Sequence, residues 1–219
     1  MKRNDNELTP EEFTGRYVRK SSLSYRILRA ILTPIAWLLY RPVFHEKEKI
    51  PAEGPVLLCT NHRSAADPAF ICMSTPRVVH YLAARELFDK IVGFFFRLAL
   101  CIPVDRKVHT GNPMFAAKTV LSRNEVIGIF PEGKRNYSRD ILLPFKFGAV
   151  SLARETGAVI VPSVIVGRFI PFISRVHVYY GDPYTISADA DLEKENEKLR
   201  RIMLDLYISH AVHDPRLPR

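Results

Sequence analysis

The sequence is poor in cysteine and lacks the cysteine patterns of metal sites and disulfide frameworks. Its three cysteines are odd in number, form no CxxC pair and lie among apolar neighbours, at Cys59, Cys72 and Cys101. We expect these thiols to be buried and reduced, as in the cytosol, and expect neither a disulfide framework nor a zinc site. The spacing of the histidines suits no metal either, so no metal or resident cofactor is expected.

Several catalytic and nucleotide-binding signatures are also missing. The chain has no GxSxG elbow, no P-loop and no GxGxxG run, which argues against a serine hydrolase and against common nucleotide-binding folds. The net charge of +9 over 219 residues indicates an anionic partner, such as nucleic acid, a membrane surface or a phosphorylated substrate. The bases cluster beside apolar residues and form no known DNA or RNA motif, so nucleic acid is not expected.

No apolar run is long enough to cross a bilayer. The most apolar early stretch, 27–40, contains Arg29 and Pro34, whereas a spanning helix needs roughly 20 apolar residues. The first twelve residues are polar, so no signal peptide is expected. We expect residues 1–13 to form a loose polar arm, and Pro34 to kink or divide the helical segment after it.

Residues 14–40 mix bases with apolar residues, and no acid occurs between Arg16 and Tyr40. Helices with a basic face and a Trp/Leu face often lie in the membrane interface. The alternative is a pair of helices packed on the body of the protein, with the bases in solvent. We therefore assign 1–40 to the arm and the docking helices, and 41–219 to a single larger domain.

From residue 43 onward, apolar strands alternate with helical patterns. This order predicts an α/β domain with a mostly parallel central sheet flanked by helices, and sites at the strand ends. The expected strands are 56–60, 78–83, 102–104, 126–130, 158–166 and 176–180, and the expected helices are 86–100, 112–123, 147–156 and an amphipathic helix around 199–206.

His62 follows the strand expected at 56–60, and Asp67 comes five residues later. Along an unbroken helix the two side chains would diverge by about 140°. A turn between them, with a helix beginning near Asp67, would bring the carboxylate to the imidazole. A carboxylate on one ring nitrogen fixes the tautomer and leaves the other nitrogen able to take a proton. The spacing alone fits equally a loop histidine followed by a helix start.

The run 130–138 also follows a strongly apolar strand. Gly133 permits a tight turn, and Lys134 and Arg135 add cations suited to a phosphate, with Glu132 placed to orient them or to bind a hydroxyl. The alternative is a basic surface turn. Arg106, after the short strand at 102–104, is by itself an ordinary solvated arginine.

Four elements occur in a fixed order, and together they resemble the PlsC-like family of glycerolipid acyltransferases, in particular the bacterial 1-acyl-sn-glycerol-3-phosphate acyltransferases. The resemblance spans roughly residues 43–185 and includes linking text between the elements. The elements are HX4D at His62–Asp67, Val104-Asp105-Arg106, Phe130-Pro131-Glu132-Gly133 with Arg135, and Val161-Pro162.

The resemblance implies that His62 is a general base toward the acceptor hydroxyl and that Asp67 orients it. It also implies that Arg106, Glu132, Gly133 and Arg135 bind the glycerol phosphate end, joined here by Lys134. The chain departs from the family pattern at Lys134, where the family usually has Thr, and at Ala84, where many members have Lys.

The implied reaction moves a fatty acyl group from acyl-CoA or acyl-carrier protein to the sn-2 hydroxyl of lysophosphatidic acid, giving phosphatidic acid in phospholipid biosynthesis. The enzyme would be peripheral and monotopic on the cytoplasmic face of an anionic cell membrane. The alternatives are another acceptor, such as glycerol 3-phosphate, another lysophospholipid or a lyso-aminolipid, and a non-catalytic lipid-binding module.

Overall fold

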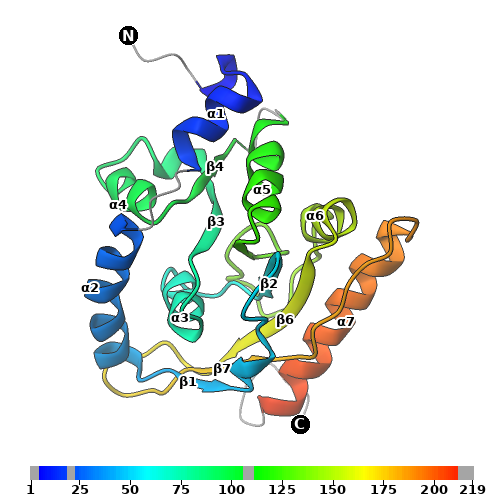
Figure 1. Cartoon of the computed structure of the whole chain (residues 1–219). Coiled ribbons are helices and arrows are strands. Elements are labelled where there is room, and N and C mark those ends of the chain that lie inside the picture. The colour runs from blue at the N-terminus through cyan, green and yellow to red at the C-terminus, as the bar shows by residue number, and fades with distance from the viewer. Residues whose placement is uncertain (1–4, 19–22, 106–110, 212–219) are drawn as a thin grey trace.

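The computed structural model describes residues 5–18, 23–105 and 111–211. Within these ranges the chain forms a seven-stranded sheet in the order β1-β7-β6-β2-β5-β3-β4 (Figure 1). All neighbouring strands are parallel except β6 and β7, which are antiparallel. The strands are β1 (Val43–His45), β2 (Val56–Thr60), β3 (Val79–Ala84), β4 (Ile102–Val104), β5 (Val126–Ile129), β6 (Val159–Val166) and β7 (His177–Tyr180).

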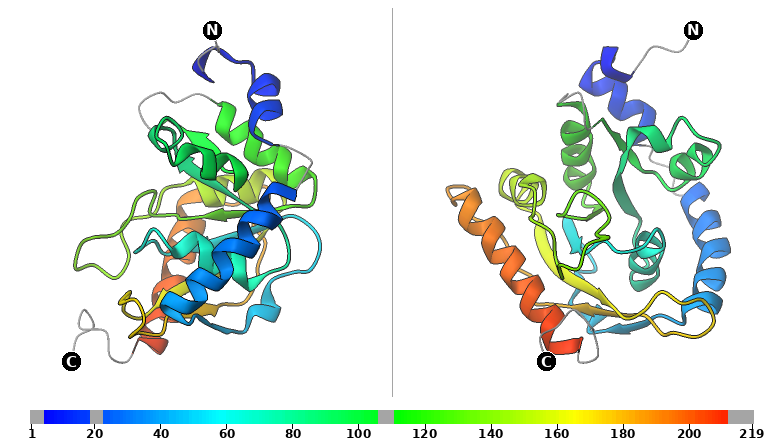
Figure 2. Two further views of the ribbon diagram at one scale, coloured as in Figure 1. Left: turned by 90° about the vertical axis from the view of Figure 1, so that its left-hand side faces the viewer. Right: turned by 180° about the vertical axis from the view of Figure 1, so that it is seen from behind.

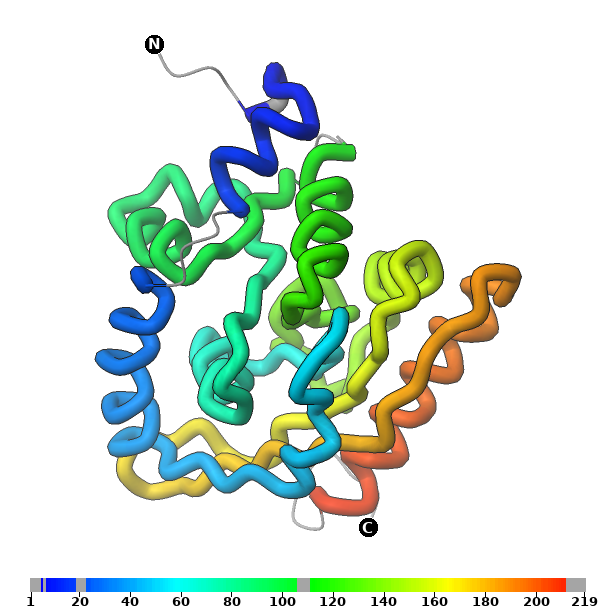
Figure 3. Tube along the Cα trace, viewed as in Figure 1, coloured from blue at the N-terminus to red at the C-terminus, as the bar shows by residue number. Residues whose placement is uncertain are grey.

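Helices cover both faces of this sheet. On one side α5, α6 and α7 pack against each other in turn, and on the other side α2 packs over α3 and α4 (Figures 1 and 3). The helical elements are η1 (Asp5–Glu7), α1 (Pro10–Tyr17), α2 (Leu23–Tyr40), η2 (Lys47–Lys49), α3 (Asp67–Ser74), η3 (Arg85–Leu87), α4 (Gly93–Leu98), α5 (Asn112–Ser122), α6 (Gly148–Thr156) and α7 (Leu192–His210).

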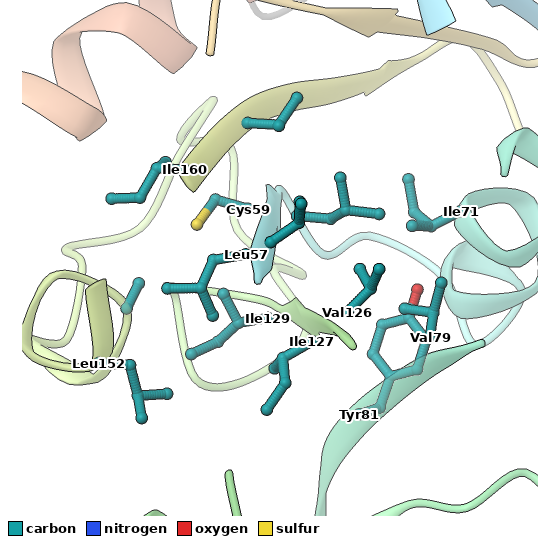
Figure 4. Packing of buried hydrophobic residues seen from close by; sticks show 14 of the residues in the cluster. Leu57, Cys59, Ile71, Val79, Tyr81, Val126, Ile127, Ile129, Leu152 and Ile160 are labelled. Carbon is teal, nitrogen blue, oxygen red and sulfur yellow. The ribbon is translucent and has the colours of Figure 1, made fainter. Parts of the chain in front are cut away.

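The central strands are buried on both faces, which explains their continuous apolar sequence. Every residue of β2 and of β5 is buried. Figure 4 shows Leu152 of α6 on the side of Leu57 and Ile127, and Ile71 of α3 on the side of Val79. The predicted α/β class with a mostly parallel sheet is confirmed by the strand pairing. The strands are apolar at every position because helices cover the sheet from both sides.

The predicted helix at 86–100 is wrong in extent. The chain instead forms the short η3, turns, and begins α4 at Gly93. A Cβ on Gly93 would lie 2.2 Å from the carbonyl oxygen of Phe88, so the glycine lets the two backbone segments touch. The edge strand β1, only three residues long, was not predicted. The other predicted strands, and the helices α5, α6 and α7, are confirmed.

The expected polar arm is also wrong where the structure describes it. Thr9 and Glu12 form a capping box that begins α1, and this helix packs against α5. Buried Asp5 accepts hydrogen bonds from Arg16 at 2.7 Å and from Tyr17 at 2.6 Å, and pairs with Arg85 at 2.6 Å. Burial and the bond to Asp5 raise the pKa of Tyr17 to about 12. The N-terminal segment is therefore anchored to the domain.

Helix α2 is not divided at Pro34, which lies inside it. Tyr25, Leu28 and Ala36 face the protein, while most of the other large apolar residues of α2 are exposed. No helix in the described ranges has the length and apolarity to cross a membrane. The division of the chain at residue 40 stays a prediction.

Candidate active site

The expected turn between His62 and Asp67 is present. Strand β2 ends at Thr60, and α3 begins at Asp67. Oδ2 of Asp67 lies 2.8 Å from Nδ1 of His62, and it also accepts from the N–H groups of Arg63 at 2.6 Å and Ser64 at 2.8 Å. Asp67 is fully buried, whereas the His62 side chain keeps 18% exposure. The turn therefore delivers a buried carboxylate to a ring that reaches the surface.

This contact decides which nitrogen of His62 is available for chemistry. An ionised carboxylate only accepts, so Nδ1 of His62 is the donor and Nε2 is left with an accepting lone pair. The ring of Phe130 stacks on the imidazole, with centroids 4.0 Å apart and planes at 17°. The stacking and the bond to Asp67 together fix the orientation of His62.

The loop after β5 holds the backbone of His62 from two sides. Oε1 of Glu132 accepts from the N–H of His62 at 2.8 Å, and the N–H of Asn136 donates to the carbonyl of His62 at 2.7 Å. Oε2 of Glu132 accepts from the N–H of Leu143 at 2.9 Å. Each carboxylate oxygen of Glu132 therefore has a backbone donor, and the residue is only 3% exposed.

Burial raises the pKa of the Glu132 carboxyl, while the N–H groups of Leu143 and His62 act in the opposite direction. Sequence reasoning placed Glu132 beside a phosphate or a substrate hydroxyl and missed this link to His62. No local pattern carries it, because the two residues lie 70 positions apart and meet only through the pairing of β2 with β5.

The predicted basic turn comes directly after Glu132 in the chain. Gly133 has a left-handed φ of +68° and donates its N–H to the carbonyl of Phe130 at 2.9 Å. Lys134 and Arg135 are exposed, and the guanidinium of Arg135 lies 5.3 Å from the ring centroid of Tyr137. The structure thus brings Gly133, Lys134 and Arg135 next to the loop of His62. Arg106 lies outside the described residues.

Asn61 fixes the direction in which the chain leaves β2. Its buried side chain donates to the carbonyl of Ile165 at 3.2 Å and accepts from the N–H of the same residue at 2.7 Å. The fourth element of the sequence lies beside it, since Pro162 and Ser163 of β6 pair with Cys59 and Thr60. This element therefore supports the strand that leads to His62.

The departure from the family pattern at Ala84 adjoins a structural ion pair. Ala84 ends β3, and the neighbouring Arg85 is committed to the buried carboxylate of Asp5. In the described part of the chain, no three or more His, Cys, Asp or Glu residues are grouped as they would be to hold a metal ion.

The family model described as Acyltransferase matches residues 41–166. The chain belongs to this acyltransferase family. Among curated relatives, a 1-acyl-sn-glycerol-3-phosphate acyltransferase of Bacillus subtilis is 32% identical over 125 residues, which are 56% of this chain and 61% of the relative. The alpha form of the human enzyme of that name is 33% identical, over 64% of this chain and 51% of the relative.

A relative of the same name from Borreliella burgdorferi is 28% identical over 84% of this chain and 77% of its own length. The chain spans about three fifths of the length of the Bacillus relative and about half of the human one. Among solved structures, the lysophosphatidic acid acyltransferase PlsC of Thermotoga maritima has a TM-score of 0.67 at 19% identity, covering 94% of this chain and 81% of that one. This likeness shows the fold.

Proposed function

We propose that this acyltransferase moves a fatty acyl group from a thioester to the sn-2 hydroxyl of 1-acyl-sn-glycerol 3-phosphate, giving phosphatidic acid. The observation that carries the proposal is the 2.8 Å contact between Nδ1 of His62 and buried Asp67, which leaves Nε2 as a base. The names of the relatives from Bacillus, Borreliella and human support this acceptor.

In the proposed reaction, Nε2 of His62 takes the proton of the acceptor hydroxyl as its oxygen attacks the thioester carbonyl. A carbon–oxygen bond forms and the carbon–sulfur bond breaks. The imidazolium then gives its proton to the leaving thiolate, which departs as the free thiol and leaves His62 neutral again. Asp67 stabilises that imidazolium through its charge. No acyl-enzyme is formed, and the donor is acyl-CoA or acyl-carrier protein.

We further propose that Gly133, Lys134, Arg135 and Arg106 bind the phosphate end of the acceptor. Glu132 takes a different role from theirs. Because its oxygens already accept from His62 and Leu143, we assign it to positioning the base and not to binding the substrate. The cations beside the base then favour acceptors that carry a phosphate.

Membrane docking is proposed for the side of the molecule formed by α2 (Figure 2, left). Its exposed apolar residues continue into α4 and into the loop after β6. The loop is joined to the end of α2 by a bond from the N–H of Phe172 to the carbonyl of Leu39 at 2.7 Å. The exposed apolar residues of this side are Leu23, Ile27, Ile31, Leu32, Ile35, Trp37, Leu38, Ile91, Val92, Phe94, Phe95, Ile170, Phe172 and Ile173.

Bases outnumber acids around this apolar side, with Arg26, Arg41, Lys90 and Arg97 all exposed. A surface of this kind suits the cytoplasmic face of an anionic membrane, where apolar residues enter the interface and bases meet the head groups. The enzyme would then be monotopic, with its acceptor drawn from the same lipid layer.

The proposal is tested by turnover of the purified protein in detergent with lysophosphatidic acid and each thioester donor. His62→Ala is expected to lower kcat by about 10²–10⁴-fold, the usual contribution of a general base. His210→Ala, at an exposed histidine of α7, is the matched control. Retained turnover in His62→Ala would overturn the mechanism, and tight lipid binding without turnover by the wild type would identify a binding module.

A further inference from the structure

Lys146, in the segment that links the third and fourth sequence elements, lies across the turn that follows Glu132. A methyl group placed on Gly133 would meet Cδ and Cε of Lys146 at 2.8 Å and its Nζ at 3.3 Å. The backbone supports this placement, because the N–H of Lys146 donates to the carbonyl of Pro131 at 2.8 Å. The stem of Lys146 therefore runs over the open face of Gly133 and carries its ammonium to the basic turn.

The ammonium of Lys146 is not neutralised by a carboxylate of the described residues. Lys49, Lys118 and Lys198, by contrast, are each paired with an acid. Lys146 is also exposed, so its charge is available to a ligand. An unpaired lysine held against a glycine turn differs from a freely moving surface lysine, because the backbone bond and the close packing restrict its stem.

Other positive groups adjoin Gly133 and Lys146 along the chain. Helix α6 begins at Gly148, two residues after Lys146, and the first N–H groups of a helix carry partial positive charge. Beyond the left-handed Gly133, Lys134 and Arg135 add two exposed cations. A turn of this conformation, flanked by cations and by a helix start, is a common anion-binding arrangement.

We propose that Lys146 is a specificity-determining residue that binds the phosphate of the acceptor together with Lys134 and Arg135. This inference rests on the proposed function and names one more residue of that same site. The phosphate would then lie beside Gly133, next to the carboxylate that holds the backbone of His62. A side chain at 133 would have to displace the end of Lys146, in addition to the strain of the left-handed φ of +68°.

The test compares Lys146→Met, which keeps most of the apolar stem, with Lys146→Arg, which keeps the charge. Lys146→Met is expected to raise KM for lysophosphatidic acid about tenfold, equivalent to about 1.4 kcal/mol, with kcat within about twofold of the wild type. Lys146→Arg should restore most of the affinity. Lys47→Met, at an exposed lysine beyond the β1 edge of the sheet, is the matched control and should leave both constants unchanged.

A purely structural role for Lys146 predicts another result. In that case both substitutions would lower the melting temperature and kcat together, with little change in KM. That pattern, or an unchanged KM in Lys146→Met, would overturn the inference about Lys146. The proposed function would still stand as long as the wild type turns over lysophosphatidic acid.

A binding measurement separates the two proposals completely. Equilibrium binding of lysophosphatidic acid is measured in detergent on the His62→Ala background, with and without Lys146→Met. A tenfold weaker Kd in the double variant supports the role of Lys146 whether or not the wild type shows turnover. Absence of turnover by the wild type would refute the proposed function alone. Equal Kd values would refute the role of Lys146.

Discussion

Replacing Asp67 by Asn removes one charge from the site and leaves its shape almost unchanged. The amide oxygen of Asn can still accept from the N–H groups of Arg63 and Ser64, which now meet Oδ2 of Asp67. The start of α3 should therefore persist. The negative charge that faces His62 is lost, and with it the stabilisation of the imidazolium that the proposed reaction forms when the acceptor hydroxyl is deprotonated.

The magnitude follows from the distance and the burial. Two unit charges about 4 Å apart attract by about 4 kcal/mol at an effective dielectric constant of about 20. The His62 side chain is 18% exposed, so solvent screens part of this interaction. A remaining effect of about 3 kcal/mol corresponds to a loss of about 10²–10³-fold in kcat. KM for lysophosphatidic acid should change little, since Asp67 is buried and does not reach the phosphate.

The assay follows release of the free thiol from acyl-CoA, with thermal unfolding of the same samples. Asp205→Asn, at an exposed acid of α7, controls for a general effect of charge. A kcat of Asp67→Asn within about threefold of the wild type would refute the reasoning. So would a fall in kcat fully accounted for by loss of folded protein.

Three other substitutions test other parts of the structure. Burial raises the pKa of Glu132 above its usual 4.5, so the native state holds that proton more tightly than the unfolded chain. In urea titrations, the free energy of unfolding of the wild type relative to Glu132→Gln should fall as pH rises from about 4.5 through the raised pKa. A difference in free energy of unfolding that does not change with pH would contradict this. Asp5→Ala should cost about 2–3 kcal/mol in urea unfolding, because Arg85 and Tyr17 lose a buried partner; a change below about 0.5 kcal/mol would argue against the anchor. Ile31→Glu should weaken sedimentation with anionic vesicles by about 10–100-fold, whereas Ile208→Glu on α7, also exposed, should not; equal binding by both would exclude the α2 side as the docking surface.

Local sequence patterns predicted the strands and the candidate pair of His62 and Asp67. Runs such as Val56–Thr60 and Val126–Ile129 are apolar at every position because both faces of the sheet are covered. The five-residue step from His62 to Asp67 allowed either a loop histidine or a paired base, and the short turn before α3 resolved it. Local patterns failed at 86–100, where contact between Gly93 and Phe88 bends the chain.

The sequence by itself determined the mostly parallel α/β class and placed His62, Asp67 and a basic turn at strand ends, because those features depend on residues close together in the chain. The acyltransferase family came from the resemblance and from the match of the family model. Only the tertiary structure decided that Glu132 holds the backbone of His62, that Arg85 belongs to Asp5, and that Lys146 crosses Gly133. These contacts join segments that meet through the order of the strands and the packing of α1, and neither can be read from neighbouring residues. The fold therefore decides which basic side chains are paired with a buried carboxylate, as Arg85 is with Asp5, and which, like Lys146, have no acidic partner among the described residues.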